Sequence, residues 1–95
     1  MHLREFQGLM RELYYQRDID RGAERTLLWL TEEVGELAEA LRKKNREAMM
    51  EELADIVAWT ASLANVLDMD LEEALMEKYP GRCRYCGSNP CVCEK

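Results

Sequence analysis

One segment constrains the fold of this chain more than any other feature of its 95 residues. From about Ala23 to Lys43 the apolar side chains recur at alternating spacings of three and four residues. These positions are Leu27, Leu30, Val34, Leu37 and Leu41. Such alternation is the a/d seam of a helix that packs against other helices in a bundle. The segment therefore predicts an all-α protein in which this helix has at least one helical partner.

Two further long helices are predicted on either side of this segment. The first runs from about Leu3 to Gln16 and is broken by the Asp-Ile-Asp-Arg-Gly stretch at residues 18–22. After a short turn, Asn45 is a suitable N-cap for a helix at about residues 46–67. The residues expected to face inward are Leu3, Phe6, Met10, Leu13, Tyr14, Met49, Leu53, Ile56, Val57, Thr60, Ala64 and Leu67.

A short fourth helix and a tail complete the chain. Asp70 and Glu73 resemble a capping box that opens this helix, and Tyr79-Pro80-Gly81 ends it. We expect residues 1–81 to form a helical domain and residues 82–95 a separate tail. Because a seam on one helical hairpin needs a partner, we expect the central hairpin to form a four-helix core with a second chain.

The two central helices carry matching pairs of carboxylates. Glu33 and Glu36 are three residues apart, as are Glu52 and Asp55, so each pair shares one stripe beside the apolar seam. In a tight antiparallel hairpin around Lys44, the two pairs face each other level by level. Facing carboxylates repel unless a cation lies between them, and oxygen ligands alone select Mg²⁺ or Mn²⁺. The competing interpretation is a solvated acidic face.

Each carboxylate pair is accompanied by a tryptophan. Trp29 and Trp59 lie on the same stripes, one helical turn farther from the hairpin loop. They therefore face each other in the predicted hairpin. Two indoles beside a metal site can stack on a nucleobase, or they can pack within the bundle or a dimer. The sequence leaves both roles open.

All four cysteines lie close together in the tail, at Cys83, Cys86, Cys91 and Cys93. Four thiolates in a reducing compartment favour one tetrahedral, structural zinc ion. Two disulfides are the alternative in a secreted chain. The N-terminus has no apolar signal region, which favours a cytoplasmic protein and therefore zinc.

The composition excludes several classes of partner. With 19 acidic against 13 basic residues, the net charge is −6, which is not the basic footprint of a nucleic-acid binder. An anionic substrate would be repelled unless cations mediate its binding. No apolar run approaches the roughly 20 residues that span a bilayer. We expect neither a nucleic acid nor a membrane as partner.

The acidic residues resemble the signature of a known family. Glu32-Glu33-x-x-Glu36, followed by Glu52-x-x-Asp55, is similar to the Glu-Glu-x-x-Glu … Glu-x-x-Asp motif of MazG-like nucleotide pyrophosphohydrolases. These enzymes belong to the all-α NTP pyrophosphatase superfamily. The resemblance covers roughly residues 22–81.

The resemblance implies an activity and roles for individual residues. It implies hydrolysis of a nucleoside triphosphate between the α and β phosphates, with nucleotide-pool housekeeping as the cellular role. The four paired carboxylates would bind Mg²⁺, and Glu32 would lie beside them or act as the base for the attacking water. Lys78, and less directly Arg25, are the candidate phosphate contacts, although related enzymes have a longer stretch before Tyr79-Pro80. Either side chain could instead be a solvated charge. The family resemblance also implies a homodimer or homotetramer.

Two other functions compete with this one. Phosphoribosyl-ATP pyrophosphohydrolase shares the acidic motif and a similar size, but the Lys-Tyr-Pro ending and the cysteine tail argue against it. The second is a non-catalytic interaction module held together by zinc. Retention of the complete acidic set argues against that module.

Overall fold

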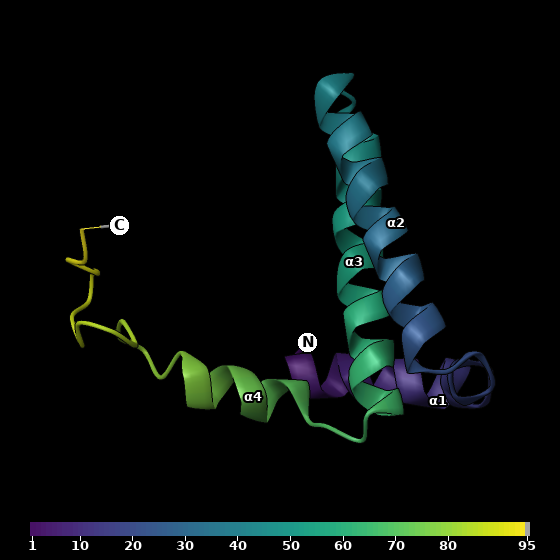
Figure 1. Ribbon diagram of the computed structural model, residues 1–95, viewed down its shortest axis with the longest axis horizontal. Coiled ribbons are helices and arrows are strands. Elements are labelled where there is room, and N and C mark those ends of the chain that lie inside the picture. The colour runs from purple at the N-terminus through teal and green to yellow at the C-terminus, as the bar shows by residue number, and fades with distance from the viewer. Residues whose placement is uncertain (95) are drawn as a thin grey trace.

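The computed structural model describes residues 1–94. Within them it contains four helices and no strand: α1 (Leu3–Arg21), α2 (Ala23–Arg42), α3 (Arg46–Val66) and α4 (Leu71–Lys78). The α2 and α3 helices form a long antiparallel hairpin, α1 crosses the base of the hairpin, and α4 leads away from it toward the tail (Figure 1). None of these helices has the length and apolar character needed to cross a membrane. The predicted all-α fold is confirmed.

The first helix is longer than expected, and the predicted break at residues 18–22 is wrong. An ion pair joins Arg21 Nη1 to Asp18 Oδ1 at 2.8 Å, and residues three apart on a helix support its last turn in this way. Gly22 then ends α1 with a φ of 85°, a value that glycine adopts without strain. The chain therefore turns directly from α1 into α2.

The predicted starts of α3 and α4 are confirmed by side-chain caps. Asn45 Oδ1 accepts a hydrogen bond from the backbone N–H of Ala48 at 3.1 Å. Asp70 Oδ1 accepts one from the backbone N–H of Glu73 at 3.2 Å. Each cap satisfies one of the N–H groups that the first turn of a helix leaves unpaired.

The crossing of α1 over α3 is close because α3 presents small buried side chains there, Ala61 and Ala64 among them. Gln7 of α1 uses the crossing to fix the next part of the chain. Its Nε2 donates to Asn65 Oδ1 at 2.9 Å, and its Oε1 accepts from the backbone N–H of Leu71 at 2.9 Å. The start of α4 is thus fastened to α1, which directs α4 away from the hairpin.

Most of the predicted apolar seam is not buried within one chain. Leu30 and Leu37 are half-buried, but five apolar residues of the hairpin are between 46% and 57% exposed: Leu27, Val34, Leu41, Leu53 and Val57. Other residues expected to face inward but found exposed are Leu13, Tyr14 and Leu67. A hairpin of two helices covers only one side of such a seam, so the other side remains open to solvent.

Candidate metal and nucleotide site

Three carboxylates meet at the interface of α2 and α3. Glu33, Glu36 and Glu52 each offer an oxygen, and these oxygens all lie within 4.8 Å of one another. Asp55 is not part of this closest set, but it is near enough for its charge to raise the pKa of all three glutamates. We call these four residues the carboxylate cluster. The antiparallel hairpin therefore brings together the side chains that the sequence paired across the turn.

Mutual repulsion and burial raise the pKa of three members of the carboxylate cluster. The pKa of Glu52 is raised by its hydrogen bond to Glu33 and then by burial. The pKa of Glu36 is raised by the hydrogen bond to Glu52 and by the charge of Glu52. For Glu33, the hydrogen bond to Glu52 lowers the pKa, but burial and the charges of Glu36 and Asp55 outweigh it, so the pKa is raised. The cluster therefore resists full ionisation without a counter-charge.

Two oxygens of the cluster are buried without a hydrogen-bond partner among residues 1–94, namely Glu33 Oε2 and Glu52 Oε2. The four ion pairs in this part of the chain also leave the cluster out. Buried carboxylate oxygens are normally hydrogen-bonded or bound to a metal. An all-oxygen set of this kind fits a hard divalent cation such as Mg²⁺ or Mn²⁺.

The two tryptophans stack one turn beyond the cluster. The ring centroids of Trp29 and Trp59 are 6.1 Å apart, with an angle of 11° between the ring planes. The guanidinium carbon of Arg21 lies 4.7 Å from the ring centroid of Trp59. Trp59 follows Asp55 by four residues, so the two share one face of α3. A stacked aromatic pair, flanked by Arg21, thus lies one helical turn from the carboxylates.

A cavity of about 330 Å³ lies between α1 and α3 beside Trp59. Its lining includes Asp18, which the sequence analysis placed in a loop and did not single out. The helical continuation of α1 buries this side chain. The only sequence signal for it was Arg21 three residues later, a spacing that permits a helical ion pair.

The remaining predicted site residues are less closely associated with the carboxylate cluster. Glu32 is exposed on α2, where its charge contributes to the raised pKa of Glu36. Arg25 is exposed in the first turn of α2. Lys78 ends α4, with its Nζ 5.6 Å from the ring centroid of Tyr79. Because α4 leads away from the hairpin (Figure 1), one chain does not bring Lys78 to its own carboxylates.

Comparison with known protein families agrees with this geometry. Residues 21–87 match the MazG nucleotide pyrophosphohydrolase domain, and this span contains the whole carboxylate cluster. The chain belongs to the MazG family. No curated protein matches this MazG chain. The family assignment supports a nucleotide pyrophosphohydrolase activity in general terms and confirms the predicted family.

In this MazG chain we expect substitutions of two glutamates on α2 to have opposite effects on thermal stability. Glu36 belongs to the carboxylate cluster, and Glu39 lies outside it. The pKa of Glu36 is raised above 4.5, so the folded state holds extra protons there and the free energy of unfolding falls as the pH rises through that window. In chelator-treated protein at neutral pH, Glu36→Gln is therefore expected to raise the Tm. The Tm is measured by thermal unfolding at pH 4, where the difference should be small, and at pH 7.

Glu39→Gln is the matched control for Glu36→Gln. The hydrogen bond and charge of Lys43, 2.8 Å away, lower the pKa of Glu39, so its stabilising contribution is present above the ordinary carboxyl pKa and lost in acid. We expect Glu39→Gln to leave the Tm unchanged or slightly lower at pH 7, because exposed ion pairs contribute little. A lower Tm for Glu36→Gln at pH 7 without metal would contradict the described repulsion.

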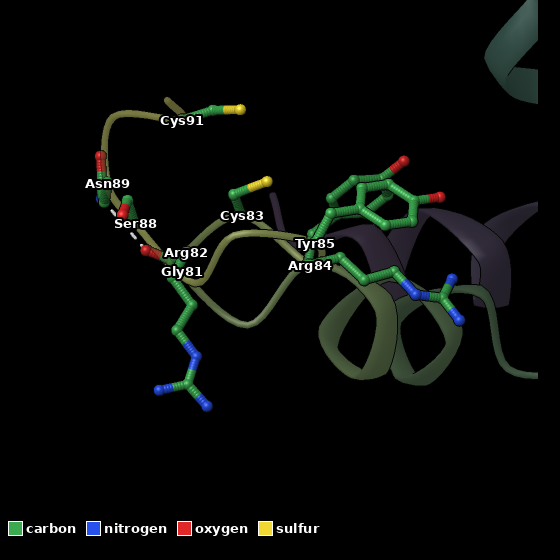
Figure 2. A pocket seen from close by; sticks show the side chains of 9 residues that line it. Gly81, Arg82, Cys83, Arg84, Tyr85, Ser88, Asn89 and Cys91 are labelled. Carbon is green, nitrogen blue, oxygen red and sulfur yellow. Dashed lines mark hydrogen bonds between the residues drawn. The ribbon is translucent and has the colours of Figure 1, made fainter. Parts of the chain in front are cut away.

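The tail brings all four cysteines within reach of one ion. Their sulfurs lie within 4.8 Å of one another, and Cys83 Sγ is 3.7 Å from Cys93 Sγ. A disulfide would need about 2.05 Å, whereas two thiolates bound to one tetrahedral zinc at about 2.3 Å lie about 3.8 Å apart. Figure 2 shows the thiol groups of Cys83 and Cys91 pointing to the same side of the tail. The cluster suits a metal ion rather than a Cys83–Cys93 disulfide.

Hydrogen bonds within the tail shift the pKa values of Cys86 and Cys93 in opposite directions. Hydrogen bonds from the backbone N–H groups of Val92 and Ser88 lower the pKa of Cys86 to about 6. Hydrogen bonding with Cys91 and then Cys83 raises the pKa of Cys93 to about 11. Without a metal, Cys86 is therefore largely a thiolate at neutral pH, and thiolates are the form that binds zinc.

Alkylation of the thiols tests this arrangement. In protein stripped by a chelator under reducing conditions at pH 7, iodoacetamide is expected to modify Cys86 before Cys93, because the thiolate is the nucleophile. Peptide mass mapping over time gives the order. Loading with zinc should protect all four thiols. Equal rates with and without zinc, or faster reaction at Cys93, would contradict the described cluster.

Proposed function

We propose that this chain is a Mg²⁺-dependent nucleoside triphosphate pyrophosphohydrolase that converts (d)NTP into (d)NMP and pyrophosphate. The observation that carries the proposal is the carboxylate cluster within the matched domain, with buried, unpartnered oxygens on Glu33 and Glu52. The reaction would remove surplus or non-canonical triphosphates from the cytoplasmic nucleotide pool.

The positions of the residues support a role for each of them. Glu33, Glu36, Glu52 and Asp55 hold Mg²⁺ or Mn²⁺. Bound there, the ion would supply positive charge against the phosphates and would lower the pKa of a water molecule. Glu32 lies on α2 beside the cluster, and its exposed carboxylate accepts the proton of the attacking water. The net charge of −6 makes a cation necessary for binding a polyphosphate at this acidic surface.

The substrate extends from the cluster in two directions. The stacked Trp29 and Trp59 supply an apolar wall for the nucleoside. Arg25 and Lys78 are the phosphate contacts. Because α4 leads away from its own hairpin, Lys78 serves the carboxylate cluster of a neighbouring chain in the assembly.

The assembly is a homodimer built on the open apolar face of the hairpin, and two dimers can form a tetramer. Leu27, Val34 and Leu41 are seven residues apart on α2, so they form one exposed stripe. Val34 is the residue after Glu33 on α2, and Leu53 is the residue after Glu52 on α3. Since the carboxylates face each other, the residues one position later lie on a common face of the hairpin. A second copy covers this face and completes a four-helix core.

The four cysteines hold one structural Zn²⁺. Four thiolates leave no open coordination position, so this ion stabilises the tail and takes no part in the reaction. The tail lies beyond the end of α4 and apart from the hairpin in Figure 1. Its zinc therefore organises residues 82–94 themselves.

The experiment is a panel of ribo- and deoxynucleoside triphosphates and phosphoribosyl-ATP, incubated with the purified protein in Mg²⁺ or in chelator. We expect monophosphate and pyrophosphate in Mg²⁺ and neither product in chelator. Turnover of phosphoribosyl-ATP alone would replace the proposal with that rival activity. Absence of turnover from folded, zinc-loaded protein would favour the non-catalytic module.

A further inference from the structure

Two exposed tyrosines, on either side of Cys83 in the chain, share one cavity. Tyr79 is 61% and Tyr85 84% exposed, and both line a cavity of about 520 Å³ at the surface of the tail, which we call the tail cavity. This volume lies within the roughly 300–1,000 Å³ typical of ligand sites. Aromatic side chains contribute most where their rings are covered, in a core or at an interface. The two rings therefore offer a surface on which a flat ligand can stack.

Backbone hydrogen bonds hold Tyr85 on a tight loop. The backbone N–H of Gly87 donates to the carbonyl of Cys83 at 2.8 Å, and the N–H of Cys83 donates to the carbonyl of Ser88 at 2.9 Å. These bonds close the base of the loop. Figure 2 shows the side chains of Arg84 and Tyr85 projecting from it. The loop thus presents an aromatic ring and a cation next to each other.

Two arginines bring positive charge to the tail cavity. Arg82 and Arg84 both line it, and neither forms an ion pair among residues 1–94. Figure 2 shows their side chains extending in different directions from the tail. Two guanidinium groups held apart in this way suit the successive phosphates of a strand better than a single terminal phosphate group.

The charge of this segment differs from that of the chain as a whole. The net charge of −6, from which we expected no nucleic-acid partner, arises before Lys78, because residues 78–93 include three basic residues and no acidic one. One zinc ion on four thiolates would carry two negative charges and leave the segment with one positive charge. The tail also lies apart from the acidic hairpin (Figure 1). The segment therefore tolerates a polyanion, and stacking has to supply most of the affinity.

We propose that residues 79–93 bind single-stranded nucleic acid, with bases stacked on Tyr79 and Tyr85 and phosphates held by Arg82 and Arg84. Proteins that bind single strands without sequence preference combine exposed aromatic rings with a cationic surface. A duplex keeps its bases stacked inside, and a mononucleotide uses only part of the surface. The inference does not depend on the proposed reaction, because none of these residues belongs to the carboxylate cluster.

The test is binding of a short fluorescent oligodeoxythymidine strand to the full chain, measured by fluorescence anisotropy. The protein carries one equivalent of Zn²⁺, and Mg²⁺ is omitted so that the carboxylate cluster does not hold phosphates. We expect a Kd of about 10⁻⁶–10⁻⁴ M, as for binding without sequence preference. The same strand paired with its complement, and thymidine monophosphate as competitor, should each bind at least about tenfold more weakly. Equal binding of either one would overturn the proposal.

Substitutions of Tyr85 test the stacking. Tyr85→Ala should weaken strand binding by about 5- to 150-fold, the range for the loss of one stacked base. Tyr85→Trp should retain the wild-type affinity, because tryptophan also offers a flat ring. Since the side chain is exposed, both variants should keep the zinc content of the wild type. Wild-type affinity in Tyr85→Ala, or the same loss in Tyr85→Trp, would contradict stacking at this position.

Arg84→Gln tests the phosphate contact. For single strands, the slope of log K against log salt concentration changes by about 0.7 for each phosphate contacted. We expect the slope of Arg84→Gln to be less steep by about this amount. Arg42→Gln is the matched control, because it removes the same charge from an exposed arginine at the end of α2. It should keep the wild-type slope, and equal slopes in the two variants would overturn the assignment of Arg84.

Discussion

Glu36→Gln is expected to slow Mg²⁺-dependent release of pyrophosphate by roughly a hundredfold or more, because a metal contact at the reacting phosphate is worth several kcal/mol. Glu36 lies in the carboxylate cluster, with its oxygen within 4.8 Å of those of Glu33 and Glu52. Asp55→Asn should have an effect of the same order. The readout is kcat and KM for pyrophosphate formation at saturating Mg²⁺.

Two measurements distinguish this loss from damage to the fold. Glu39→Gln removes a carboxylate of the same helix that pairs with Lys43 outside the cluster, and it should keep wild-type activity. The Tm of metal-free Glu36→Gln should not fall, since the substitution relieves repulsion. A residue that lowers stability yet is needed for activity is typical of a functional site. Wild-type turnover in Glu36→Gln would contradict the assignment of this residue as a metal ligand.

Val34→Glu and Val57→Glu are expected to convert the proposed dimer into monomers. Both side chains are about half exposed in one chain and lie on the open face of the hairpin. Burying a valine contributes roughly 1.5–3 kcal/mol, and burying an unpaired charge costs more. Two-fold symmetry applies the change twice in every dimer. Light scattering coupled to gel filtration, over a range of concentrations, measures the mass.

Leu28→Glu is the matched control for the dimer. Leu28 is 69% exposed and lies about 100° around α2 from Leu27, so it points away from the proposed contact. This variant should remain dimeric. The monomeric variants should also lose activity if Lys78 of one chain serves the cluster of its neighbour. A wild-type protein that is monomeric at micromolar concentration would rule out the proposed interface.

Local features of the fold followed from the sequence. Apolar spacing identified all four helices, and the caps at Asn45 and Asp70 identified two of their starts because each depends on a residue three positions away. The pairing of Glu33 and Glu36 with Glu52 could be anticipated for a related reason. A tight turn fixes which levels of an antiparallel hairpin face each other.

Features that depend on contacts between distant parts of the chain could not be predicted from the sequence in the same way. Charged residues are seldom fully buried, and the cavity that Asp18 lines forms only where α1 packs against the distant α3, so the sequence did not indicate it. The position of Lys78 depends on the direction of α4, which the hydrogen bonds of Gln7 to Asn65 and Leu71 determine. These contacts join residues far apart in the chain. The exposure of Val34 reflects the same limit, because the seam predicts burial without saying which chain provides it.

The most direct test of the central claim is hydrolysis of a triphosphate in water enriched in the heavy oxygen isotope, with mass spectrometry of the products. Attack on the α phosphorus predicts one heavy oxygen in the nucleoside monophosphate and an unlabelled pyrophosphate, formed only when Mg²⁺ is present. Formation of diphosphate and orthophosphate, or label in the pyrophosphate, would contradict the account of how this MazG chain uses its carboxylate cluster.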